Sequence, residues 1–112
     1  MQFIPLENIE QLDRISKAKD AQLILKHNTT CSISKGVLDR LHAETASIEG
    51  IEAVHVLDLL SHRDLSDTVA GRFGVPHQSP QILLIENGRC VYHEWGFDIS
   101  AEAISQALEA NA

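Results

Sequence analysis

The stretch AQLILKHNTTCSIS, residues 21–34, joins an apolar run to a cysteine and then to a helical pattern. Its apolar residues are consecutive rather than alternating, which predicts a strand buried on both faces over 21–27. Beyond Cys31, apolar side chains recur at positions 33, 37, 38 and 41, which predicts a helix that runs to about Ser47. The thiol therefore lies at the junction between a buried strand and the first turn of a helix.

This junction favours a reactive thiol. The first turn of a helix has unpaired N–H groups and the positive end of the helix dipole, and both favour the thiolate over the thiol. We expect Cys31 to attack disulfides and, above all, to leave readily from them. The neighbouring side chains are polar, with threonine at 29 and 30 and serine at 32 and 34, which supports this interpretation. The alternative is that Cys31 is a small buried hydrophobic side chain, as most single cysteines are.

The rest of the chain alternates between helical and strand patterns. The predicted elements around the 21–47 unit are a helix over 8–19, a strand from about 54 to 58, a helix from about 65 to 73, strands over 81–86 and 89–95, and a helix from 100 to about 110. Asn87-Gly88 is a strong hairpin signal, so the last two strands are antiparallel neighbours. We expect an α/β protein with a thioredoxin-like fold, in which a central four-stranded mixed sheet has helices on both faces. With 112 residues and 44% hydrophobic content, the chain suits a single domain over 1–112.

Ser79-Pro80 stands at the start of the third predicted strand, where we expect a cis proline in this topology. An ordinary trans proline is the alternative. Beside a cis proline, the backbone of Ser79 would be free to pair with an extended substrate. A two-residue hairpin turn pairs Pro80 with Trp95 and Ile82 with His93. Trp95 would thus lie at the reactive end, either lining a thiol-binding groove or closing the end of the sheet.

The second cysteine, Cys90, falls beside the hairpin turn, too far from Cys31 for the Cα separation of about 7 Å or less that a disulfide needs. We interpret Cys90 as a packed thiol, with an intermolecular disulfide as the alternative. Ser34 occupies the position, one helical turn after Cys31, where dithiol oxidoreductases carry a second cysteine. It can donate a hydrogen bond but cannot form a disulfide. The sequence therefore predicts a monothiol cycle, in which Cys31 carries a small thiol until another thiol releases it.

The candidate site follows from these placements. Cys31 and Ser34 are the predicted catalytic residues, although Ser34 is equally well explained as a simple serine on the helix surface. The predicted substrate-binding residues are Thr30, Ser32, Ser79, Pro80 and Trp95.

At these residues the chain resembles the monothiol bacilliredoxins of the YtxJ type, which have a thioredoxin-like fold. The stretches that carry the resemblance, over nearly the whole chain, are Ile4-Pro5-Leu6, His27 through Ser34, Gly74-Val75, His77-Gln78-Ser79-Pro80-Gln81 and Trp95. The resemblance implies that the protein removes bacillithiol, or a related low-molecular-weight thiol, from modified protein cysteines. It also implies Cys31 as the nucleophile, with no metal or organic prosthetic group. The family often has proline after the cysteine, and Ser32 departs from that pattern.

Charge and hydropathy exclude several classes of partner. The net charge is −7 without a run of lysine or arginine, so we expect no binding to nucleic acid or to an anionic membrane. No apolar run approaches the roughly 20 residues that span a bilayer, and no basic and apolar leader precedes the first helix. We therefore expect a cytoplasmic protein with free thiols. The six histidines lie on different predicted elements without the ligand spacing of a metal site, although His27 and His77 could flank the cysteine.

Three functions are compatible with this sequence. The preferred one is a thiol–disulfide oxidoreductase whose partners are S-thiolated client proteins and a small thiol. A thioredoxin-like binding module would instead hold a partner at the Pro80 edge, with Cys31 inert. A dimer that shares external thiols could carry an iron–sulfur cluster, as monothiol glutaredoxins do, but the local motif differs from theirs.

Overall fold

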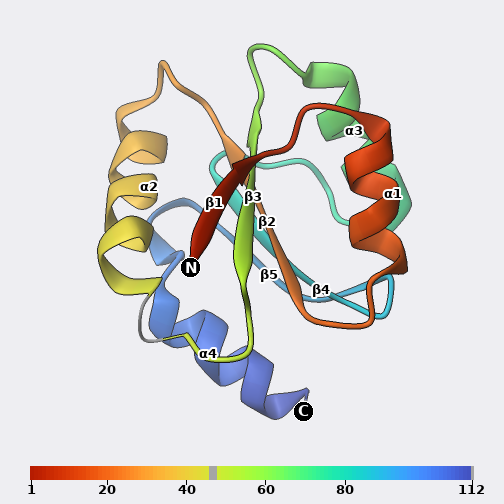
Figure 1. Ribbon diagram of the computed structural model, residues 1–112. Helices are drawn as coiled ribbons and strands as arrows, with labels where there is room; N and C mark the ends of the chain where they lie inside the picture. The colour runs from red at the N-terminus through yellow and green to blue at the C-terminus, as the bar shows by residue number, and fades with distance from the viewer. Residues whose placement is uncertain (46–47, 112) are drawn as a thin grey trace.

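The computed structural model describes residues 1–45 and 48–111 (Figure 1). Their elements are β1 (Gln2–Pro5), α1 (Ile9–Lys17), β2 (Gln22–His27), α2 (Ser32–Glu44), β3 (Ala53–Asp58), α3 (Arg63–Phe73), β4 (Gln81–Glu86), β5 (Arg89–Trp95), the short 3-10 helix η2 (Gly96–Asp98) and α4 (Ala101–Ala110). Most predicted boundaries are confirmed to within two residues. The predicted end of the second helix near Ser47 lies outside the described residues, in which α2 extends to Glu44.

The strands form one sheet in the order β1-β3-β2-β4-β5. β3 runs parallel to both β1 and β2, whereas β4 is antiparallel to both β2 and β5. The α/β thioredoxin-like fold with a mixed sheet is confirmed, but the prediction of four strands is wrong because β1 adds a fifth. β1 has only four residues, too few to show an alternating pattern, and it ends in Pro5. Proline is tolerated in a sheet only at an edge, which is where β1 lies.

Helices cover both faces of the sheet, as Figure 1 shows. Val37 of α2 and Ile104 of α4 share one buried cluster with Leu25 of β2. Leu12 of α1 and Val69 of α3 share a second cluster with the neighbouring β2 residue at position 24. Because successive strand residues face opposite sides, a central strand covered on both faces must be apolar at every core position. The consecutive apolar run at 23–25 has this origin.

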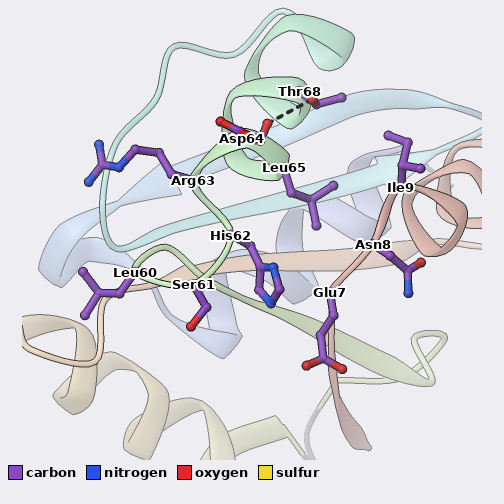
Figure 2. Close-up of a pocket in the computed structure, with 10 residues that line it drawn as sticks. All are labelled: Glu7, Asn8, Ile9, Leu60, Ser61, His62, Arg63, Asp64, Leu65 and Thr68. Atoms are coloured by element: carbon purple, nitrogen blue, oxygen red, sulfur yellow. Dashed lines mark hydrogen bonds between the residues drawn. The ribbon is translucent and has the colours of Figure 1, made fainter.

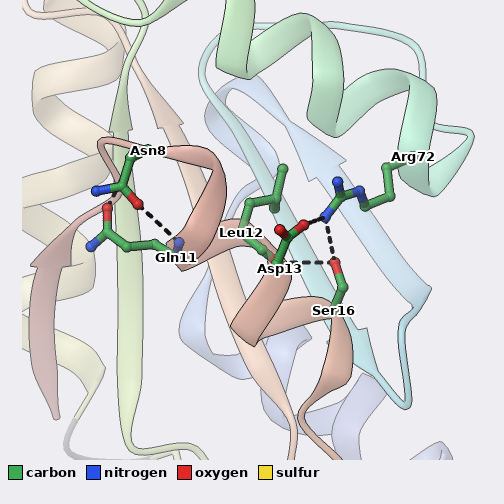
Figure 3. Close-up of polar contacts among 6 residues, drawn as sticks. All are labelled: Asn8, Gln11, Leu12, Asp13, Ser16 and Arg72. Carbon is green, nitrogen blue, oxygen red and sulfur yellow. Dashed lines mark hydrogen bonds and ion pairs between the residues drawn. The ribbon is translucent and has the colours of Figure 1, made fainter.

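Polar contacts cap the start of α1 and join this helix to α3 (Figure 3). Asn8 caps α1, because its Oδ1 accepts the N–H of Gln11 at 2.9 Å, and the Gln11 side chain accepts the N–H of Asn8 at 3.2 Å. This reciprocal pair satisfies two N–H groups that a helix start would leave open. Arg72 of α3 donates to the Asp13 carboxylate at 2.8 Å and to Ser16 Oγ at 3.2 Å. The two helices therefore pack as one layer on the face of the sheet opposite α2 and α4.

The β4–β5 hairpin turns at Asn87 and Gly88, which have φ angles of 52° and 75°. Positive φ at both central residues is the geometry that an Asn-Gly hairpin turn needs. Glycine is also required by space, since a Cβ atom at position 88 would lie 2.8 Å from the carbonyl oxygen of Ser16. The predicted hairpin is confirmed, and its turn packs against α1.

A β-bulge shifts the register within this hairpin. The pairing skips one residue of β5 between Leu84 and Ile85, so that Gln81 faces Trp95 and Leu83 faces His93. The predicted partners, Pro80 for Trp95 and Ile82 for His93, are therefore wrong by one residue. A bulge adds an unpaired residue to one strand, and neither the turn nor the apolar pattern reveals it.

Candidate active site

Cys31 stands at the start of α2, as the residue that caps the helix. Its N–H donates to the carbonyl oxygen of Asn28 at 3.1 Å, which closes a tight turn after β2. The cysteine is partly exposed, carries a free thiol, and makes no side-chain hydrogen bond to the helix N–H groups. The thiol therefore meets solvent beside the unpaired N–H groups of a 13-residue helix, as the sequence predicts.

Asn28 organises the loop that carries the thiol. Its Oδ1 accepts hydrogen bonds from the N–H of Thr30 at 3.0 Å and from the Thr30 hydroxyl at 2.8 Å. Its own N–H donates to Ser34 Oγ at 3.1 Å. Sequence reasoning did not single out Asn28, although asparagine two residues before threonine at the end of a strand is a known signal for such a turn.

The two serines near the cysteine differ in their surroundings. Ser34 is fully buried and holds the turn through Asn28, whereas Ser32 is exposed at the first position of α2. Thr30 is exposed, but its hydroxyl is already bound to Asn28. The structure thus places Thr30, Ser32 and Ser34 around Cys31 and gives Ser34 a positioning contact in the loop.

The Ser79-Pro80 peptide bond is cis, as expected from the sequence. Pro80 precedes Gln81, which pairs with Lys26 near the end of β2. The proline therefore lies at the same end of the strands as the loop that carries Cys31. The carbonyl of Pro80 accepts the N–H of Gly96 at 3.0 Å, which holds the end of β5 beside the cis proline.

A groove of about 500 Å³ lies beside the cysteine helix. Its lining residues are Ile33, Ser79, Pro80, Trp95, Gly96, Phe97 and Asp98. Three predicted substrate-binding residues, Ser79, Pro80 and Trp95, thus gather in one groove, and Ile33 places it two residues from Cys31. Thr30 and Ser32 are not among its lining residues. Phe97 was missed because a single exposed aromatic residue after a strand belongs to no periodic pattern.

A buried lysine lies under the loop that leads to Pro80. Lys26 of β2 has no exposed surface, and its Nζ donates to Nδ1 of His77 at 3.2 Å. The hydroxyl of Ser66 lies 3.3 Å from the same Nδ1 atom of His77. Burial lowers the pKa of Lys26, and Asp67 opposes that shift. Burial and then the lysine charge lower the pKa of His77, so its neutral ring can accept from the ammonium group.

His27, the residue next to this lysine, faces the other side of the sheet and is also buried. Its Nδ1 has no hydrogen-bond partner among the described residues. Burial lowers the pKa of His27, while the carboxylates of Asp58 and Asp39 oppose the shift. Both histidines that the sequence associates with the cysteine are therefore held near this edge of the sheet in surroundings that favour their neutral form.

Cys90 has different surroundings. It lies next to the hairpin turn, packs against the buried cluster under α1 and α3, and donates from Sγ to the carbonyl oxygen of Tyr92 at 3.3 Å. Burial raises the pKa of the Cys90 thiol. Both cysteines are free and partly exposed, and they differ in their place in the fold and in the contacts they make.

A second pocket, of about 640 Å³, opens between the start of α1 and the start of α3 (Figure 2). It is lined by Glu7, Asn8, Ile9, Leu60, Ser61, His62, Arg63, Asp64, Leu65 and Thr68. No predicted site residue and no sulfur atom is among them. Over residues 1–45 and 48–111, no helix is both long and apolar enough to cross a bilayer, and no three His, Cys, Asp or Glu side chains gather as a metal site requires.

Comparison with known proteins agrees with this geometry. The family model of the monothiol bacilliredoxin BrxC matches residues 4–104. A solved thioredoxin-fold protein described as a candidate oxidoreductase is 29% identical, with a TM-score of 0.84 over 95% of this chain and 93% of its own. Thioredoxin from Trypanosoma brucei brucei is 12% identical, with a TM-score of 0.79 over 98% and 90% of the two chains. Mitochondrial thioredoxin 3 from Saccharomyces cerevisiae is 16% identical, with a TM-score of 0.75 over 96% and 94%.

Proposed function

Because the chain belongs to the monothiol bacilliredoxin family, we propose that it is a thiol–disulfide oxidoreductase that removes a small thiol from protein cysteines through Cys31. Membership of this family and the likeness to a thioredoxin-fold protein support thiol redox chemistry. The observation that carries the proposal is the placement of one partly exposed thiol at the start of α2, without a second cysteine one turn later.

The first step is a thiol–disulfide exchange. The Cys31 thiolate attacks the small-thiol sulfur of a mixed disulfide on a client protein. The client S–S bond breaks, a new bond forms between Cys31 and the small thiol, and the client sulfur leaves as a thiolate that takes a proton from water. The client is thereby reduced, and the enzyme carries the small thiol as its own mixed disulfide.

The second step requires an external thiol, because position 34 is serine and Cys90 lies at the turn end of the hairpin. A free small thiol attacks the sulfur bound to Cys31, leaves with it as a symmetric disulfide, and regenerates the Cys31 thiolate. We propose bacillithiol or a related thiol as this co-substrate. Sulfur chemistry alone completes the cycle, so no metal or prosthetic group takes part in it. The cycle suits the cytoplasm, where small thiols are kept reduced.

The remaining predicted residues have roles in binding and positioning. Ser34 holds the turn at Asn28, which fixes the direction in which Cys31 leaves the sheet. Ser79 and Pro80 offer main-chain groups to the client segment, and Trp95 forms the apolar wall beside them. Thr30 and Ser32 flank the reacting sulfurs.

Intact-mass spectrometry tests the proposal and identifies the cargo. The reduced protein is incubated separately with a client peptide modified by bacillithiol, glutathione or coenzyme A. We expect a mass gain of one small thiol on Cys31 from one of these donors, together with release of the free peptide thiol. Cys90→Ser should retain the transfer, and Cys31→Ser should lose it.

The same experiment separates the enzyme from a binding module. A module would bind the client peptide equally well before and after the Cys31→Ser substitution and would gain no mass from any donor. Transfer that persists in Cys31→Ser, or that moves to Cys90, would contradict the proposal.

A further inference from the structure

Two of the side chains that line the groove beside α2 are exposed aromatic rings. Trp95 is 54% exposed and Phe97 is 71% exposed, the highest value among the large apolar side chains of the described residues. Both line the groove together with Ile33 and Pro80. Single exposed apolar residues need no explanation, but two aromatic rings around one hollow indicate a binding surface.

The backbone that carries these rings is held in place. One guanidinium nitrogen of Arg40, on α2, donates to the carbonyl oxygen of Phe97 at 3.2 Å and to that of Ile99 at 2.8 Å. On the other side of Phe97, Gly96 has a φ of 74° and donates its N–H to Pro80. The backbone at Phe97 is thus held by Arg40 of α2 and, through Gly96, by Pro80. The exposure of its ring does not result from a loosely attached loop.

The polar groups of the groove suit a polypeptide. Ser79 Oγ is buried and has no hydrogen-bond partner among the described residues, so the groups that Ser79 can offer to an incoming chain in the groove are those of its main chain. Asp98 is the one charged residue among those that line the groove, and it is exposed. The Asp98 carboxylate favours a basic over an acidic side chain at this end of the groove.

We propose that this groove selects client proteins, binding an extended segment in which an apolar side chain adjoins the thiolated cysteine and a lysine or arginine follows it. The proposal rests on the proposed function and defines its substrate class. The apolar side chain packs against Trp95 and Phe97, the basic side chain meets Asp98, and the main chain pairs with Ser79. Ile33 borders both this groove and the cysteine turn, so a segment seated here brings its modified sulfur to Cys31.

Peptide exchange kinetics test the proposal. Four peptides carry one cysteine as a mixed disulfide with 2-mercaptoethanol, which is small and uncharged. Leucine or serine flanks the cysteine on both sides, and lysine or glutamate occupies the next positions. The rate of exchange at Cys31 is divided by its rate with 2,2′-dipyridyl disulfide, which measures the reactivity of the thiol without a peptide.

For the wild-type protein we expect the leucine–lysine peptide to exchange about tenfold faster than the serine–glutamate peptide, given one partly buried apolar contact and one exposed charge pair. Phe97→Ser should remove most of the preference for leucine. Asp98→Lys should invert the roughly threefold preference for lysine over glutamate. Ile9→Ser, an exposed apolar residue on α1, and Asp20→Lys, an exposed acid at the opposite end of β2, should keep the wild-type preferences.

Each other outcome has a defined meaning. If the leucine and lysine preferences survive in both Phe97→Ser and Asp98→Lys, the groove does not select clients, although the proposed thiol transfer is unaffected. A wild-type dimer in sedimentation that Phe97→Ser dissociates would assign the groove to a second copy and would also overturn this selection of clients. A protein that reacts with dipyridyl disulfide but with none of the four peptides would refute the proposed function together with this groove.

Discussion

The contact between Ser34 and Asn28 gives a residue-scale account of the serine that stands in place of a second cysteine. Ser34 Oγ is buried and accepts the Asn28 N–H. Ser34→Ala should lower the free energy of unfolding by about 1–2 kcal/mol, because it leaves a main-chain donor without a partner. Ser32→Ala removes an exposed hydroxyl and should change it by less than about 0.5 kcal/mol. Urea denaturation measures both, and equal losses would contradict the account.

Ser34→Cys tests the monothiol cycle at the same position. A cysteine there completes the Cys-x-x-Cys spacing of dithiol oxidoreductases. After transfer of a small thiol to Cys31, this variant should release it as a free thiol and form a disulfide between positions 31 and 34. The wild-type adduct should persist until external thiol is added. Quantification of the released thiol checks the result, and equal persistence of both adducts would show that a thiol at position 34 is not placed to resolve Cys31.

The sequence was sufficient to predict Cys31 and its position at a strand–helix junction, because each depends on local pattern. The clustering of Ser79, Pro80 and Trp95 followed from the fold topology. Contacts that depend on side-chain direction could not be predicted in this way. Asn28 as the organiser of the turn, Arg40 as the support of Phe97, and the burial of Lys26 all become visible only when separate elements are packed together.

At the scale of elements, the central strands, the four helices and the Asn-Gly turn have strong periodic or turn signals and were predicted. The two errors concern features without such signals. β1 is short and gains its stability from pairing with β3, which no local pattern shows. The bulge in β5 keeps both flanking segments in strand geometry, so only the pairing itself reveals the shift of one residue.

The tether between β2 and the loop before Pro80 gives an element-scale prediction. Lys26→Met removes a buried charge, and apolar replacement of such a group is often neutral or stabilising by up to a few kcal/mol. Yet the loop loses the bond that joins its His77 to position 26 of β2. We expect amide hydrogen exchange over residues 75–79 to accelerate at least several-fold, without a loss of global stability.

Lys19→Met, which removes an exposed lysine near the end of α1, serves as the control for the Lys26 experiment and should leave exchange in the loop unchanged. If Lys26→Met also leaves it unchanged, the lysine does not hold the loop.

At the scale of the whole molecule, stability should depend on pH through three histidines, of which His27 is buried, His55 partly buried and His77 exposed. Burial lowers the pKa of His27, His55 and His77 from the ordinary value of 6.5. Below about pH 6.5 the unfolded chain therefore binds protons that the folded protein resists, and the free energy of unfolding falls as the pH drops toward the lowered pKa values. Above about pH 7 these histidines are neutral in both the folded and the unfolded state, so they no longer change the free energy of unfolding with pH.

His55→Gln isolates one part of this effect. His55 lies on β3, where its Nε2 is 2.9 Å from Gln22 Oε1, away from the cysteine edge. Urea unfolding at several pH values should show a smaller loss of stability on acidification for this variant than for the wild type. An identical pH dependence would show that His55 titrates alike in the folded and unfolded states.

The central claim is that the thiol at the start of α2 is the nucleophile of this protein and that the thiol in the hairpin is not. Site-resolved alkylation of the native, fully reduced protein with a limiting amount of iodoacetamide tests this most directly. The account predicts that nearly all of the label appears first on Cys31, while Cys90, which is partly exposed but has a pKa raised by burial, is modified much more slowly until the protein unfolds. Equal labelling of the two cysteines, or earlier labelling of Cys90, would contradict it.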